Sequence, residues 1–226
     1  MLDGCYKALT GMAHCKAPGL DDFPMEFYVK FSSVLGSDLV DVLNSCYHSV
    51  FVSLSVQRYY YLTFKKGECL DARNWRLISL LNVDFKIAAR AIAGWLLKVI
   101  HLVVAKDQTC GVPDRYIWEN VAFLWDLSYA TTFDSPVAIL SRDQEKAFDR
   151  VDWGFMLSTL RTMGFGASFV NWVRLLYTNV QSAVNVNGYL SFFFSLSRGV
   201  HQGCYLRRFQ NLRLVQKRLR FKAQHV

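Results

Sequence analysis

Apolar residues recur with a helical period along much of this chain. After Pro24 they lie three or four positions apart from Phe27 to Cys46, which predicts a helix there. Residues 16–24, before this helix, and residues 107–115, much later in the chain, are rich in turn-forming residues and are expected to be loops. The same spacing predicts further helices at about 84–105, 116–129, 152–163 and 167–178.

Three other segments have the composition of strands. Residues 58–64 are aromatic, and residues 136–142 form a short apolar run that predicts a buried strand ending at Asp143. Residues 180–186 and 189–196 flank Asn187-Gly188, the preferred pair for a type I′ hairpin turn. Strands separated by helical segments predict a mixed α/β (α+β) domain.

Composition narrows the class of protein, and the charge has an uneven distribution. The chain has 226 residues, of which 52% are apolar and 15% aromatic, and this excludes an intrinsically disordered chain. The formal net charge is +8, but residues 207–226 carry seven Lys and Arg and no acid. The remaining 206 residues are nearly neutral. Net charge therefore indicates a polyanionic partner for the tail more than for the body.

Several function classes are disfavoured by what the sequence lacks. The six cysteines are scattered, which fits a reducing compartment better than a zinc site or a disulfide framework. No signal peptide is recognisable, so an intracellular location, cytoplasmic or nuclear, is expected. The longest apolar region, residues 87–105, contains Arg90, Lys98 and His101 and is typical of a core helix rather than a membrane span.

The segment AILSRDQEKAFDRVDW holds the clearest candidate chemistry. Asp143 follows the expected strand 136–142, so its carboxylate would project from a rigid support, and magnesium prefers such oxygen ligands. The alternative is that Asp143 caps a short helix and Phe148 lies in the core. Asp149 and Asp152 are expected to be structural, with Asp152 as the N-cap of the following helix.

Five segments together resemble one known family. LSRDQEKAFDRVDW resembles the first catalytic motif of the reverse transcriptases of non-LTR (LINE-type) retrotransposons. The other four segments occur in the family's order, and the set covers roughly residues 10–206. They are KAPGLDDFPMEFY, FKKG…DARNWRLISLLNVDFKI, DQTCGVPDRYIWEN and SRGVHQGC.

The resemblance implies an RNA-directed DNA polymerase that uses magnesium, an RNA template, a DNA primer and deoxynucleotide triphosphates. Asp143 matches a catalytic ligand of the metal ions, and Phe148 matches an aromatic that disfavours a 2′-hydroxyl on the incoming sugar. Without the resemblance, Phe148 would be interpreted as a core residue.

The remaining matched residues concern the nucleotide and the template. Lys66 and Arg76 match basic residues that hold the triphosphate, although solvated surface cations are the ordinary alternative. Gln202 and Gly203 match a turn that lies against the template and the nascent base pair. An ordinary loop glycine is the alternative for Gly203.

The chain also departs from the family pattern. The family's second motif, an aromatic-x-Asp-Asp hairpin, is missing, and no Asp or Glu follows Asp152. We therefore expect a truncated, catalytically inactive copy, because carboxylates that bind the metal ions directly would be lost. Leu77 replaces a proline, and Asp22 and Asp114 replace glycines at positions where positive φ angles are expected.

The predicted organisation is a partial polymerase domain followed by a basic tail. Residues 1–135 would form the fingers and the start of the palm, and residues 136–206 the front of the palm. The tail, 207–226, lies outside the family pattern and has the spacing of a basic amphipathic helix. Two alternatives remain open: a non-catalytic nucleic-acid-binding fragment, or a non-functional relic that folds poorly.

Overall fold

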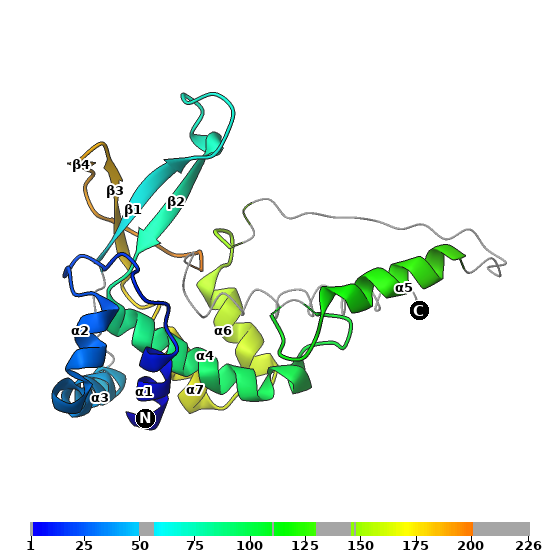
Figure 1. Ribbon diagram of the computed structural model, residues 1–226, viewed down its shortest axis with the longest axis horizontal. Helices are drawn as coiled ribbons and strands as arrows, with labels where there is room; N and C mark the ends of the chain where they lie inside the picture. The colour runs from blue at the N-terminus through cyan, green and yellow to red at the C-terminus, as the bar shows by residue number, and fades with distance from the viewer. Residues whose placement is uncertain (1, 50–56, 110, 130–145, 147, 201–226) are drawn as a thin grey trace.

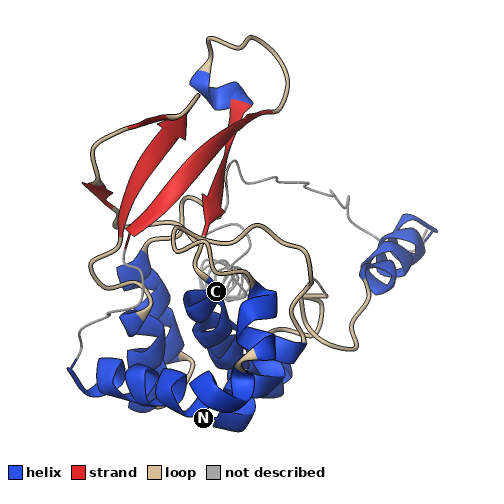
Figure 2. Ribbon diagram, turned by 60° about the vertical axis from the view of Figure 1, so that its left-hand side comes forward, coloured by secondary structure: helices blue, strands red, loops and turns tan. Residues whose placement is uncertain are grey.

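The computed structural model describes residues 2–49, 57–109, 111–129, 146 and 148–200. Helices form a lower layer, and a small mixed sheet stands on it (Figures 1 and 2), which confirms the predicted α/β class. The elements are α1 (Leu2–Thr10), α2 (Met25–Lys30), α3 (Ser32–Ser49), β1 (Gln57–Phe64), the 3-10 helix η1 (Ala72–Asn74), β2 (Trp75–Leu80), α4 (Val83–Val103), α5 (Ile117–Tyr129), α6 (Trp153–Thr162), α7 (Ala167–Leu175), β3 (Gln181–Val186), β4 (Tyr189–Leu190) and β5 (Phe194–Ser195).

The region after Pro24 forms two helices instead of the single helix expected. Phe31 separates α2 from α3 with φ −101° and ψ 15°. Backbone hydrogen bonds still cross this residue, because Phe31 N–H donates to Phe27 O at 3.0 Å and Leu35 N–H donates to Phe31 O at 2.9 Å. The periodicity therefore located the helical region correctly, but it did not reveal one non-helical backbone conformation within it.

Helix α4 is the centre of the helical layer. Its Ile92, Leu96 and Ile100 side chains are fully buried, as the predicted helix at 84–105 requires. α4 packs against α1 and α7. Each buried side chain of this size contributes roughly 1.5–3 kcal/mol to folding, so this helix anchors the described fold.

Aromatic rings join three helices of the layer. Trp172 of α7 stacks on Tyr47 of α3 with ring centroids 4.6 Å apart, and it meets Trp95 of α4 edge-on at 6.3 Å. Offset and edge-to-face arrangements at these distances are favourable beyond the area they bury. The contacts fix how α3, α4 and α7 sit against one another.

The sheet has the strand order β2-β1-β3-β4, with β5 also paired to β3. β1 and β2 form an antiparallel hairpin, whereas β1 and β3 are parallel from Gln57↔Gln181 to Tyr61↔Asn185. A parallel pair needs a long connection, and here helices α4 to α7 lie between the two strands in sequence. The strand at 58–64 was expected, but β2 and the parallel pairing were not.

The hairpin predicted around Asn187-Gly188 is confirmed. Both residues have positive φ angles, 50° and 86°, as a type I′ turn requires. The return segment is broken into β4 and β5 instead of forming one strand. Leu190 pairs with Asn185, and Phe194 pairs with Ser182, so the return segment has one extra residue between these pairs, which is a β-bulge.

The later helices also lie close to their expected positions. Asp152 caps α6 as predicted, with its Oδ1 accepting the Phe155 N–H at 2.8 Å. α5 lies apart from the other helices in both views, and large apolar side chains along it, such as Trp118 and Phe123, are more than 60% exposed (Figures 1 and 2). The strand expected at 136–142 lies outside the described residues.

Candidate functional site

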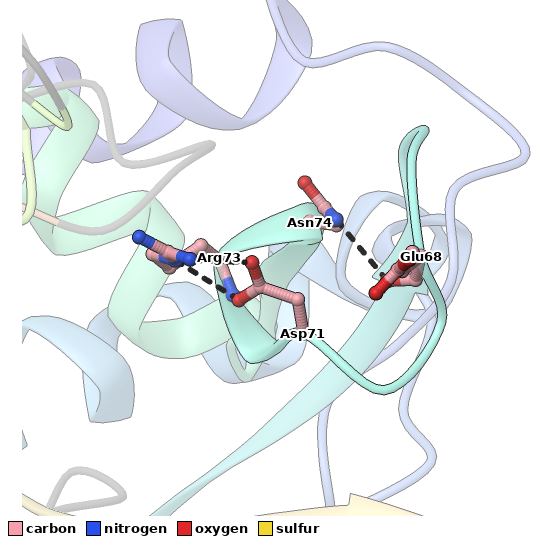
Figure 3. Close-up of polar contacts among 4 residues, drawn as sticks. All are labelled: Glu68, Asp71, Arg73 and Asn74. Carbon is pink, nitrogen blue, oxygen red and sulfur yellow. Dashed lines mark hydrogen bonds and ion pairs between the residues drawn. The ribbon is translucent and has the colours of Figure 1, made fainter.

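The β1–β2 hairpin projects from the body and ends in a loop that is held by its own polar contacts (Figures 1 and 3). Asp71 Oδ1 accepts the Arg73 N–H at 2.9 Å, and its Oδ2 pairs with the Arg73 guanidinium at 2.9 Å. Asn74 Nδ2 donates to Glu68 O at 3.1 Å. Hydrogen bonding by Arg73 holds the pKa of Asp71 below its usual range, so this acid is ionised at neutral pH.

The same hairpin carries the two cations singled out in the sequence. Lys66 lies in the loop after β1, and Arg76 lies on β2 opposite Thr63. Both side chains are exposed. Two further hydrogen bonds hold this loop together. Lys65 N–H donates to Asn74 O at 2.9 Å, and Trp75 Nε1 donates to Cys69 O at 2.8 Å. The structure therefore places both cations on one projecting and internally braced element.

A second part of the site forms where two distant segments run side by side. Val200 N–H donates to Phe148 O at 2.8 Å, and Gly199 N–H donates to Val151 O at 2.8 Å. The Trp153 indole donates to Gly199 O, also at 2.8 Å. Gly199 has φ +99°, a conformation that other residues adopt only with strain. The segment that contains AFDRVDW is thus joined directly to the segment that begins SRGV.

A cavity of about 200 Å³ lies between these segments and the sheet. Its lining includes Leu77 and Ser79 of β2, Tyr60 of β1, and Asp149 and Arg198. Burial raises the pKa of Asp149 above its ordinary value, with the Lys146 ammonium acting in the opposite direction. The cavity therefore brings parts of three sequence motifs together around one half-buried carboxyl.

The predicted site residues fall into two groups. Lys66, Arg76 and Phe148 are described, with Phe148 half-buried beside the Val200 backbone. Asp143, Gln202 and Gly203 lie outside the described residues, so their predicted roles stay predictions. Sequence reasoning treated Asp149 as structural and did not identify the cavity it lines. Its position next to Phe148 was the available signal, but the cavity depends on β2, which was not expected.

The described residues do not by themselves form a magnesium site. Among them there is no group of three or more His, Cys, Asp or Glu side chains positioned to hold a metal ion. Asp149 lines the cavity, and the nearby Asp152 is engaged in capping α6. The magnesium prediction rests on Asp143, which lies outside the described residues.

The loop at 16–24 is fastened to the start of α4. Asn82 occupies the N-cap position of α4, but its Oδ1 accepts the Leu20 N–H at 2.7 Å instead of capping its own helix. Lys86 Nζ donates to Ala17 O at 3.4 Å. Burial, together with the Asp21 charge, raises the pKa of Asp84 to about 6. This loop and the helix that follows β2 therefore form one unit beneath the hairpin.

The segment 107–115 is fastened to the other end of α4. The Arg115 guanidinium donates to Ala105 O at 2.6 Å and Gln108 O at 3.0 Å, next to the last turn of the helix. Cations at this position interact favourably with the helix C-terminus.

Asp22 and Asp114, which replace glycines in the family pattern, have φ angles of 56° and 58°. The expectation of positive φ at both positions is confirmed.

A known protein-family model matches the part of the chain that contains most of the sequence motifs. The family model described as "Reverse transcriptase (RNA-dependent DNA polymerase)" matches residues 64–207, which is more than half of the chain. The chain belongs to the reverse transcriptase family. This match contains the hairpin loop, β2, the junction between Phe148 and Val200 and every cavity residue except Tyr60, whereas β1 lies before it apart from Phe64.

A transposon protein extends the comparison toward the N-terminus. The "Transposon TX1 uncharacterized 149 kDa protein" of Xenopus laevis is 40% identical over 207 residues. The alignment covers 91% of this chain and 16% of that protein. The recognition of a LINE-type reverse transcriptase is confirmed by these two comparisons. In the part of the chain that the structure describes, no helix is long and apolar enough to cross a bilayer.

Proposed function

We propose that this reverse transcriptase chain supplies the fingers and the front of the palm of an RNA-directed DNA polymerase from a LINE-type element. The observation that carries the proposal is the direct contact between distant motif segments. Phe148 bonds to Val200, Leu20 bonds to Asn82, and one cavity joins β2 to Asp149 and Arg198. These motif segments occur in the family's order along the sequence, and they also contact one another in the fold. Both observations favour a shared function.

The proposed division of the chain follows the sequence motifs. Residues 1–206 belong to the polymerase, with residues 1–135 as fingers and start of palm and residues 136–206 as front of palm. Residues 207–226 form a basic tail outside this part. The body of helices holds the hairpin, and the hairpin presents its cations to a nucleotide.

Lys66 and Arg76 hold the triphosphate of an incoming deoxynucleotide in this proposal. Their exposure on a braced hairpin supports the role, because a loop that keeps its shape loses less entropy when it binds phosphate. A guanidinium donates to two phosphate oxygens at once, whereas an ammonium acts as a compact charge. Arg73 of the same loop is already paired with Asp71 and is not assigned this role.

Phe148 is the proposed contact for the sugar of that nucleotide. It is half-buried, and its carbonyl is fixed by Val200, two positions before Gln202 in the sequence. Gln202 and Gly203 would contact the template and the nascent base pair. Such an arrangement would let one rigid junction support both the nucleotide and the template.

Magnesium enters the proposal through Asp143, as in the family generally. Reverse transcriptases use two divalent ions to stabilise the attacking and leaving oxygens. No Asp or Glu follows Asp152 in this sequence, so the 226 residues contain no second carboxylate motif after the first. Residues 1–226 alone are therefore expected not to polymerise DNA.

Primer extension on an RNA template tests this proposal. Neither the 226-residue chain nor its Asp143→Ala variant should extend a DNA primer with magnesium and deoxynucleotides. Extension by the unmodified chain would contradict the expected inactivity. If that extension also survived Asp143→Ala, the metal role of Asp143 would be wrong.

Nucleotide labelling tests the hairpin independently of catalysis. A photoreactive deoxynucleotide triphosphate should label the unmodified chain, and Lys66→Ala or Arg76→Ala should reduce labelling about tenfold or more. Lys30→Ala is the matched control, because Lys30 is an exposed cation at the end of α2, outside the hairpin. Equal labelling of all four proteins would overturn the triphosphate site.

Nucleic-acid binding without catalysis is a second candidate function. It is favoured by the seven cations and absence of acids in residues 207–226. If all seven met phosphates, the affinity for nucleic acid should fall about 10³–10⁵-fold between roughly 50 and 200 mM salt. Unchanged binding after deletion of residues 207–226 would count against this function.

A further inference from the structure

Helix α5 stands apart from the other helices of the described fold (Figure 1). It has no substantial packing contact with another helix or strand that the structure describes. Its start is nevertheless held in place, because Asn120 Nδ2 donates to Thr109 Oγ1 at 3.0 Å. Arg115 also ties the segment before α5 to Ala105, next to the end of α4. α5 is therefore a supported helix that the described elements leave uncovered.

One face of α5 is apolar and exposed. Trp118, Val121 and Tyr129 recur at helical spacing and therefore share this face, which we call the α5 face. Their side chains are 68%, 47% and 78% exposed. Large apolar side chains that gather on an exposed surface indicate an interaction site, because their contact with water is unfavourable.

The charge of α5 restricts what can cover this face. The charged residues of α5 are Glu119 and Asp126, which are exposed and lie seven residues, about two helical turns, apart on one edge of the α5 face. A second copy of α5 packed antiparallel would bring this acidic edge against itself, and like charges repel. An anionic lipid surface is disfavoured for the same reason.

The basic tail, residues 207–226, has the complementary pattern. It lies outside the described residues, but its sequence contains seven Lys and Arg and no acid. Three apolar residues of the tail have the spacing of one helical face, and they are Leu212, Val215 and Leu219. Arg213 and Arg220 are seven residues apart, which is the separation of the two acids on α5.

We infer that the basic tail of this chain docks on the α5 face as an amphipathic helix. Its apolar side covers Trp118 and Tyr129, and its two matched arginines pair with Glu119 and Asp126. Because the spacings are equal, both pairs form in a single register. Burial of apolar surface supplies most of the affinity, and the charge pairs select the register.

A segment of the same chain has an advantage over a free partner. A flexible connection gives the tail an effective concentration on the order of millimolar at α5. Docking uses two of the seven tail cations and leaves the others for a polyanion. The contact requires neither a nucleotide nor magnesium, so its test is separate from that of the proposed function.

Hydroxyl-radical footprinting of the full chain tests the docking. Mass spectrometry of the oxidised peptides measures how accessible Trp118 and Tyr129 are to solvent. In the unmodified chain both side chains should be protected, relative to a variant that lacks residues 207–226. Light scattering on the same samples reports the oligomeric state.

Two double variants should each expose the α5 face. Glu119→Lys with Asp126→Lys reverses the charge of α5, and Arg213→Glu with Arg220→Glu reverses the matching charge of the tail. Replacing two attractive pairs by two repulsive pairs should shift the docking equilibrium about tenfold, so the oxidation of Trp118 should rise. The combination of all four substitutions restores opposite charges and should restore the protection.

Matched controls carry the same changes of charge at other positions. Asp38→Lys with Asp41→Lys alters two exposed acids of α3. Arg218→Glu with Lys222→Glu alters two tail cations that are four residues apart. Trp118 should stay protected in both. An α5 helix that had unfolded would not be repaired by substitutions in the tail, so the combined variant separates misfolding from loss of docking.

Equal oxidation of the unmodified chain and the tail-deletion variant would overturn the docking, as would a combined variant without restored protection. Loss of protection in both controls would overturn it in favour of an unspecific effect of net charge. Protection that requires a dimer and persists without the tail would assign the α5 face to a second copy of the chain. Nucleotide labelling that depends on Lys66 and Arg76 can succeed or fail independently of each of these results.

Discussion

The helical layer and the sheet use apolar residues in opposite ways. In α4, Ile92, Leu96 and Ile100 are completely buried. In the sheet, Phe64 is 40% exposed and Leu190 is 43% exposed, on opposite faces. The layer therefore supplies most of the burial that stabilises the fold, whereas the sheet keeps large side chains available to a ligand. Apolar composition alone does not distinguish these two uses.

The junction between the two regions depends on a few polar contacts. Asn82 joins the loop at 16–24 to the start of α4, immediately after β2. Phe148 and Val200 are joined by a backbone hydrogen bond beside the cavity. A substitution in the layer should thus change stability, one at Lys66 or Arg76 on the hairpin should change nucleotide binding, and one at the junction should change both.

The largest effect is expected for Leu96→Ala. Leu96 is 0% exposed, so the substitution removes buried contacts and leaves a cavity that costs about 2–5 kcal/mol of unfolding free energy. Leu190→Ala, at a sheet position that is 43% exposed, should cost less than about 1 kcal/mol. Urea unfolding of both variants measures the difference. Equal losses would show that the sheet is as tightly packed as the helical layer.

A smaller effect is expected at the junction, from Gly19→Ala. An added Cβ would lie against the Asn82 side chain and 2.5 Å from its Cα, so Leu20 would lose its bond to Asn82. The expected cost is about 1–3 kcal/mol. Gly94→Ala is the matched control, because nothing lies within 4 Å of a Cβ there and α4 would gain helix propensity. A neutral Gly19→Ala would mean that the loop is not fastened to the layer.

The smallest effect concerns pH, and it arises in the helical layer. Burial raises the pKa of Asp84 from 3.8 to about 6, so the folded state retains its proton to higher pH than the unfolded state. Stability is therefore greatest below the unfolded pKa and decreases as pH rises through about 6. Asp84→Asn should remove this dependence and stabilise the protein at pH 7, by on the order of 1–2 kcal/mol. Denaturant midpoints of the unmodified protein and of Asp84→Asn, measured between pH 4 and 7, test this prediction. The same pH dependence in both proteins would contradict the raised pKa of Asp84.

Local patterns predicted most of the elements, because they depend on neighbouring residues. The period of apolar residues located α4 and α5, and Asn187-Gly188 identified the hairpin turn. Phe31 was missed because an interruption of one residue leaves the period intact. The bulge before Phe194 was missed because it adds a single residue to an otherwise regular segment.

Long-range pairing was beyond these patterns. The register of β1 with β3 joins residues more than 100 positions apart, and no local signal specifies it. The same is true of the cavity, where Asp149 meets Leu77 and Arg198. Motif resemblance did identify Lys66, Arg76 and Phe148, which the structure describes.

The central claim is that the β1–β2 hairpin contacts the incoming nucleotide while the helical layer supports the hairpin. Crosslinking of a photoreactive deoxynucleotide triphosphate to the full chain, followed by mass spectrometry of the crosslinked peptides, tests this directly. The expected result is crosslinks within residues 57–80, in peptides that contain Lys66 or Arg76. Crosslinks confined to α1, α3 and α4, or to residues 207–226, would contradict the account.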